Sequence, residues 1–206
     1  NSASTLGVGV YNLVNGTVNV GGNVWLGGYG SGTINQTSGS FNTHSWTSIG
    51  RQTGGTGVWN ISGGTLNHNS TGTRIIVGEN GTGTLDVSGS AQVTTTGGLR
   101  IGNSSTANGT VNLDGGTITA PLVETAGGST TLNFNGGVLK AGANAQLNFM
   151  TNITAVYLKN SSVIDTVTNI IAINSAIYDG GAGGTLTKNG SGTLLLDGAN
   201  YYPGRT

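Results

Sequence analysis

The sequence predicts an all-β protein, a right-handed single-stranded parallel β-helix (β-solenoid) of about seven to eight coils. Three observations predict it: 40 glycines among 206 residues, an internal repeat of about 25 residues, and three short segments of alternating apolar and polar residues within each repeat. A single coil cannot bury its apolar side, so the coils must stack and share one core. The right hand is expected because connections between parallel strands strongly prefer it.

The first segment of each repeat is a triplet with a polar residue at its centre. The central residues are Asn12, Asn35, Asn60, Asp86, Asn112 and Asn133. Because alternate residues of a strand point to opposite sides, the apolar residue before each centre is expected inside and the polar column outside. The inward column is then Tyr11, Ile34, Trp59, Leu85, Val111 and Leu132. The alternative, with the asparagines inside, would expose most of this apolar column.

Two further strands are expected in each repeat after a glycine turn. The second strands are marked by Val18, Phe41, Leu66, Val93, Ile118 and Leu139. The third strands end on Gly27, Gly50, Gly78 and Gly102. The fifth repeat breaks the third-strand pattern at Leu122, Val123 and Glu124.

The sequence predicts one solenoid domain over residues 1–206, with regular repeats over 1–140. The sequence repeat becomes less regular after Lys140. Looser coils and a cap are expected over 141–206, since repeat arrays need shielded ends. Neither end carries a recognisable processing signal, and both resemble cuts within a longer chain. Covalently linked neighbouring domains are therefore expected as partners.

The segment 184–202, GTLTKNGSGTLLLDGANYY, resembles the autotransporter-associated β-strand repeat of bacterial surface proteins. The resemblance implies a β-solenoid in an exported bacterial protein, secreted or held at the cell surface. It implies little about function, because solenoids carry lyases, adhesins and inert stalks alike. A composition rich in Asn, Thr, Ser and Gly is in keeping with an exported protein.

The charge balance argues against several classes of partner. Charged residues make up 7% of the chain, seven basic against seven acidic, so no net field attracts nucleic acid or an acidic membrane. No apolar run approaches the ~20 residues that span a bilayer. The same neutrality favours, for a glycan ligand, one with little or no uronic acid.

Catalytic and metal-binding constellations are not expected. The acidic residues fall one or two per coil and in different columns; Glu79 aligns with Arg51 of the preceding coil, which predicts an ion pair, and Asp86 belongs to the asparagine column. Asp86 and Asp114 are two residues out of register, with no helper group. Two histidines and no cysteine are too few for a typical zinc site. We therefore expect no enzyme activity, metal or cofactor.

One feature suggests a binding surface. Alternation places Trp25 and Trp46 on the outside of the third strands of adjacent coils, offset by two residues and about 8 Å apart. Exposed indoles on a rigid sheet suit stacking against successive sugar rings. The further residues expected at this surface are Tyr29, His44, Arg74 and Arg100.

The sequence therefore predicts a carbohydrate-binding module for a xylan- or glucan-like polysaccharide of plant or microbial cell walls. Its architecture is similar to that of the parallel β-helix modules attached to polysaccharide-degrading enzymes. The alternative is a structural or adhesive passenger repeat of a bacterial surface protein, in which the tryptophans serve as structural cover. Trp25, for example, could lie beneath an N-terminal segment, residues 2–6.

Overall fold

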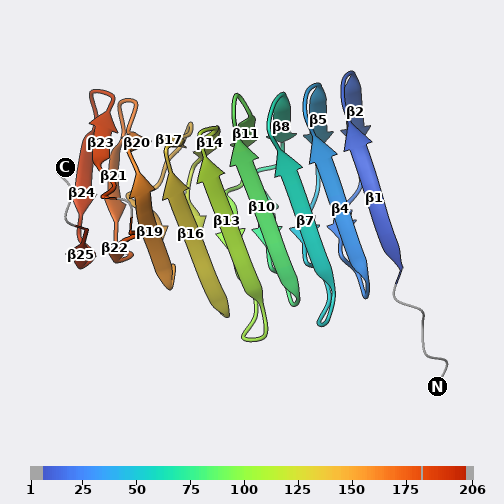
Figure 1. The fold of residues 1–206 in the computed structure, drawn as a ribbon. Helices are drawn as coiled ribbons and strands as arrows, with labels where there is room; N and C mark the ends of the chain where they lie inside the picture. Colours follow the sequence, from blue (N-terminus) through green and yellow to red (C-terminus); the bar gives the residue numbers. More distant parts are fainter. Residues whose placement is uncertain (1–6, 182, 203–206) are drawn as a thin grey trace.

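The computed structural model describes residues 7–181 and 183–202, and its only regular elements there are β-strands. They form three parallel sheets that run side by side along a β-solenoid of about eight turns (Figure 1). Each coil contributes one strand to each sheet, and β1 and β25 lie at opposite ends of the stack. The predicted β-solenoid fold is confirmed.

The three sheets take every third strand in chain order. The first contains β1 (Val8–Leu13), β4 (Ser31–Gln36), β7 (Thr56–Ile61), β10 (Thr82–Ser88), β13 (Asn108–Asp114), β16 (Ser129–Asn135), β19 (Ala155–Asn160), β22 (Ile177–Asp179) and β25 (Asn200–Tyr201). The second contains β2 (Thr17–Val20), β5 (Ser40–Thr43), β8 (Thr65–His68), β11 (Gln92–Thr95), β14 (Thr117–Ala120), β17 (Val138–Ala141), β20 (Ser162–Asp165) and β23 (Leu186–Asn189). The third contains β3 (Val24–Leu26), β6 (Thr47–Ile49), β9 (Ile75–Val77), β12 (Leu99–Ile101), β15 (Val123–Glu124), β18 (Asn148–Thr151), β21 (Ile170–Ile173) and β24 (Thr193–Leu196).

The predicted apolar column fills the core beside the first sheet. The column is in register from coil to coil, and its members from Ile34 to Leu132 are at most 5% exposed. Trp59 is fully buried, with its ring centroid 4.8 Å from that of Phe41. Tyr11 also meets Phe41, edge to face at 6.4 Å. It remains 47% exposed because it lies in the first of the described coils, where no earlier coil covers it.

The asparagine column lies outside, as predicted. Asn35 donates from Nδ2 to Asn12 Oδ1 at 2.9 Å, and Asn60 donates to Asn35 at 2.8 Å. Beyond Asp86 the pattern resumes, with Asn133 donating to Asn112 at 2.6 Å. These bonds satisfy polar side chains that are crowded one strand spacing apart. The inward alternative for this column is wrong.

Glycines are required where the third sheet turns into the first. Gly50 and Gly78 have φ of +77° and +75°, a backbone conformation that residues with a Cβ atom rarely adopt. A Cβ on Gly83 would lie 2.2 Å from both Gly78 N and Ile49 O. Backbones of neighbouring coils therefore meet at this corner too closely for any side chain, which explains the recurring glycines of the repeat.

One corner of the core is polar. His68 is fully buried, and its Nδ1 lies 2.9 Å from Thr43 Oγ1. Its Nε2 lies 3.2 Å from Thr73 Oγ1, and Thr47 donates to Thr43 at 3.1 Å. Burial lowers the pKa of His68 below its ordinary value of 6.5, and the charge of His44 acts in the same direction, whereas a hydrogen bond with Thr73 opposes the shift.

The C-terminal coils continue in the same three sheets after Lys140. Their stacking is less regular, because the register shifts between Phe134 and Asn135 and again between Asn148 and Met150. The last strands of the described chain are largely open to solvent, with Tyr201 63% exposed. Among the described residues, no helix is long and apolar enough to cross a membrane.

Candidate functional site

The outer surface of the third sheet carries one residue per coil in strict register. Trp25 lies beside Ser48, and the column continues through Ile76, Arg100 and Glu124. The residues on either side of this column, such as Val24 and Leu26 around Trp25, point into the core, so the column itself faces outward. We call the outer surface of β3, β6, β9, β12 and β15, with the residues that immediately flank these strands, the aromatic face.

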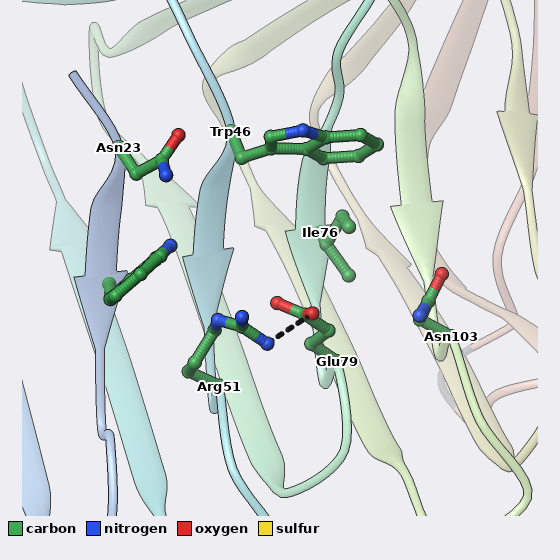
Figure 2. A pocket seen from close by; sticks show the side chains of 7 residues that line it. Asn23, Trp46, Arg51, Ile76, Glu79 and Asn103 are labelled. Atoms are coloured by element: carbon green, nitrogen blue, oxygen red, sulfur yellow. Dashed lines mark hydrogen bonds and ion pairs between the residues drawn. The ribbon is translucent and has the colours of Figure 1, made fainter.

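Trp25 and Trp46 lie on the aromatic face as predicted. Trp46 is two residues before Ser48, the register partner of Trp25, so the expected offset is present. Trp25 is 57% exposed and Trp46 is 38% exposed. The two indoles line one hollow of about 180 Å³, which is completed by Asn23, Arg51, Ile76, Glu79 and Asn103 (Figure 2).

Arg51 and Glu79 form the ion pair that their alignment predicts. Arg51 Nη1 lies 2.5 Å from Glu79 Oε1, and Ser48 Oγ donates to the other carboxylate oxygen. Figure 2 shows the two charged side chains pointing toward each other, below Trp46 in this view. The guanidinium carbon of Arg51 also lies 4.8 Å from the centre of the Trp25 ring, a cation–π contact. Arg51 therefore contacts Trp25 and also borders the hollow.

Arg100 and Arg74 share the carboxylate of Glu124. Arg100 donates to Glu124 Oε1 from Nη2 at 2.6 Å and from Nε at 3.0 Å, and its Nη1 donates to Asn103 at 2.8 Å. Arg74 Nε lies 2.8 Å from the same Oε1. The structure thus places both predicted arginines on the aromatic face, and through Asn103 it connects Arg100 to the hollow.

Tyr29 and His44 are exposed but do not line this hollow. Tyr29 follows β3 in the loop that leads to β4, and it is 69% exposed. His44 is exposed in the turn between β5 and β6, two residues before Trp46. Residues 2–6, considered above as a cover for Trp25, lie outside the described residues. Of the six predicted site residues, Trp25 and Trp46 line the hollow, and Arg74 and Arg100 lie on the same face outside its lining.

Sequence analysis missed other members of the site. Ser48, Asn103 and Glu124 were not assigned to it, although the register that aligns Trp25 with Ser48 also aligns Arg100 with Glu124. A full alignment of the third strands would have revealed the ion pair of Arg100 and Glu124.

A second aromatic group, on the first sheet, was also missed. Tyr157, Tyr178 and Tyr201 follow the asparagine column on the outside of β19, β22 and β25. The ring centroids of neighbouring tyrosines are 6.0 Å and 5.4 Å apart, and the second pair is stacked. The three rings pack against one another along the stack, although Tyr201 at its end is still 63% exposed.

The aromatic face offers a particular chemistry. The indoles offer flat apolar surface, and the amides of Asn23 and Asn103 offer donors and acceptors beside it. Both carboxylates, Glu79 and Glu124, are held by arginines. Within residues 7–181 and 183–202, no group of three or more histidine, aspartate or glutamate side chains is placed to hold a metal ion. The arrangement suits the binding of a ligand with both apolar and hydroxylated surface.

No family model, curated protein or solved structure matches this chain.

Proposed function

We propose that the protein is a non-catalytic carbohydrate-binding module that binds a xylan- or glucan-like cell-wall polysaccharide on its aromatic face, outside the cell. The observation that supports this proposal is the pairing of Trp25 and Trp46, both exposed, around one hollow with polar walls. Sugar rings present a C–H surface that packs against indole, while their hydroxyl groups need hydrogen-bonding partners such as Asn23 and Asn103.

The size of the hollow favours a polymer that lies across the surface. Its volume of about 180 Å³ is below the ~300–1,000 Å³ typical of pockets that enclose a small molecule. A chain of sugars can instead touch both indoles in succession while most of its length stays in solvent. The two tryptophans come from adjacent coils, so such a chain would cross the direction of the strands.

The rigidity of the surface also supports binding. Ser48 and Ile76, between the aromatic and charged residues, are at most 2% exposed although they point outward. Their burial shows that the side chains of this face are packed against one another. A pre-packed surface loses little conformational entropy when it takes a ligand.

Affinity gel electrophoresis tests the proposal. The wild-type chain is run in gels that contain soluble xylans, glucans or mannans, beside Trp25→Ala and Trp46→Ala. Tyr201→Ala is the matched control, because it removes an exposed aromatic ring from a different sheet. We expect one polymer class to retard the wild type and the control but neither tryptophan variant, with unchanged circular dichroism for all four proteins.

A structural passenger repeat is the second candidate, and the uninterrupted stacking of all three sheets from β1 to β25 favours it. A module of this kind needs no ligand. If no polymer retards the wild-type chain, the carbohydrate-binding proposal fails and the structural role becomes the better account.

A further inference from the structure

The charges on the aromatic face do not balance, although those of the whole chain do. The expectation of a glycan with little or no uronic acid rested on the neutrality of the whole chain, so it does not take this surface into account. The chain has seven basic and seven acidic residues. The aromatic face carries three arginines, Arg51, Arg74 and Arg100, against two carboxylates, Glu79 and Glu124. Three positive charges minus two negative charges leave one positive charge beside the exposed tryptophans.

Two of the three arginines have their own carboxylate. Arg51 pairs with Glu79 at 2.5 Å. Arg100 places two of its nitrogens within 3.0 Å of Glu124 Oε1 and a third on Asn103. Such charge-assisted contacts are the strongest hydrogen bonds that these groups make, so both guanidinium groups already have a carboxylate partner, although the buried Nε of Arg51 has no acceptor in the described chain.

Arg74 is the arginine without a carboxylate of its own. Its Nε is 2.8 Å from the Glu124 oxygen that Arg100 already uses. This nitrogen is itself buried, the approach lacks hydrogen-bond geometry, and no acceptor for it is found in the described part of the chain. The side chain is 27% exposed. Arg74 is therefore a partly exposed cation whose hydrogen-bonding capacity is not met within the described chain.

The position of Arg74 connects its charge to the tryptophans. Trp46 immediately precedes β6 and Arg74 immediately precedes β9, and the first residues of these strands, Thr47 and Ile75, are register partners. Trp46 and Arg74 thus occupy equivalent places in adjacent coils, about 4.8 Å apart in the backbone. The side chain of Arg74 extends from there, past β12, to Glu124. A chain of sugars that crosses the coils from Trp25 past Trp46 would therefore meet this guanidinium group next.

We propose that the polysaccharide recognised by this face is acidic, a glycan that carries uronic-acid carboxylates, and that Arg74 binds one of these carboxylates. This inference rests on the proposed carbohydrate-binding function and specifies its ligand. A planar carboxylate matches the fork of guanidinium donors, and the two carboxylates already on this face show that its arginines bind such groups. A third carboxylate, supplied by the ligand, would bring the face to neutrality.

The test compares one polymer with and without its charge. The probes are a xylan substituted with glucuronic acid and the same xylan after chemical reduction of its carboxyl groups. The proteins are the wild type, Arg74→Gln, Trp25→Ala and Lys140→Gln. Lys140 is the matched control, because it is an exposed cation on the second sheet, 4.0 Å from Asp165.

We expect the acidic xylan to bind the wild type and Lys140→Gln more tightly than the reduced xylan. Arg74→Gln should weaken binding of the acidic xylan about tenfold, the loss of one charge-assisted contact, and leave binding of the reduced xylan unchanged. Added salt should likewise weaken binding of the acidic polymer alone.

The outcomes separate this inference from the function on which it rests. In one outcome the wild type binds both xylans equally, Trp25→Ala abolishes this binding and Arg74→Gln does not change it. That result would overturn the proposal of an acidic ligand and would still support a carbohydrate-binding module. Failure of the wild type to bind either xylan or any other glycan would overturn both. If Arg74→Gln weakens the binding of both xylans equally, Arg74 shapes the surface but does not bind a carboxylate of the ligand, and the inference is again overturned.

Discussion

Asp86 faces Asn60 across adjacent coils, yet within the described chain no hydrogen bond joins their side chains. Asn60 donates its amide to Asn35, on its far side, and presents its oxygen to Asp86. A carboxylate is only an acceptor, so two acceptors meet at this point of the asparagine column. On its other side, Asp86 accepts a hydrogen bond from Asn112.

Asp86→Asn is therefore expected to stabilise the protein. The new amide can donate to Asn60 and still accept from Asn112, which completes the column from Asn12 to Asn133. We expect a gain of about 1 kcal/mol in the free energy of unfolding, measured by urea denaturation. Asn112→Asp, which would place a second carboxylate beside Asp86, should lower stability instead. A loss of stability in Asp86→Asn would show that the carboxylate has a favourable partner and that this reading of the column is wrong.

Glu79→Gln should destabilise the aromatic face. The substitution removes the countercharge of Arg51, whose side chain is only 25% exposed, and weakens the bond from Ser48. A partly buried cation left without its partner costs about 2 kcal/mol, which thermal or urea unfolding can measure. The control is Asp165→Asn, which breaks the looser and more exposed pair with Lys140 and should cost less than about 1 kcal/mol. Equal effects of the two variants would contradict the prediction.

Stability should fall as the pH drops below about 6.5 because of His68. Burial lowers the pKa of His68 in the folded protein, so below the pKa of the unfolded chain the unfolded state binds more protons. The stabilising contribution is complete above about pH 6.5 and is lost at up to about 1.4 kcal/mol per pH unit until the folded pKa is reached. Urea unfolding between about pH 7.5 and about pH 5 measures this slope.

His68→Gln should remove most of the pH dependence of the free energy of unfolding below about pH 6.5. A substitution of the exposed His44 provides the control. His44→Gln removes a neighbouring charge that also lowers the pKa of His68, so its profile should be only slightly flatter than that of the wild type. A profile unchanged by His68→Gln would mean that other groups account for any pH dependence.

Gly83→Ala should destabilise the solenoid strongly. The added methyl group would lie 2.2 Å from backbone atoms of Gly78 and Ile49, so the corner between two coils must open. We expect a loss of about 3 kcal/mol or more, measured by thermal unfolding. Gly72→Ala is the matched control, since a Cβ there meets nothing within 4 Å, and it should change stability little. A tolerated Gly83→Ala would show that the corner can shift.

The fold was largely predictable because its physical requirements recur in every coil. Apolar residues at a period of two within strands fix which side faces the core, as the burial of Trp59 shows, and glycines recur at the corner between the third and first sheets. The predicted pair of Arg51 and Glu79 depended on the same alignment. The partial exposure of Tyr11 follows from its place in the first described coil, which a repeat pattern alone does not reveal.

The site was less predictable because side chains on the outer surface have more freedom than those in the core. The outward positions of Trp25 and Trp46 followed from alternation. Long arginine side chains, however, reach beyond their own coil: Arg74 contacts Glu124 although their strands are separated by β12. Contacts of this length do not follow from the position of the backbone.

The parallel register of the third sheet has a consequence for how such surfaces can change over evolution. Every coil advances the chain by one strand spacing, about 4.8 Å, so the separation between an indole and a guanidinium group on different coils is quantised in that step. Duplication or loss of one repeat between β3 and β12 would move Trp25 relative to Arg100 by one whole step, without redesign of the core. The number of coils between two ligand-binding side chains thus sets the distance between them. This distance can change by the gain or loss of a repeat, without any change in the shape of a pocket.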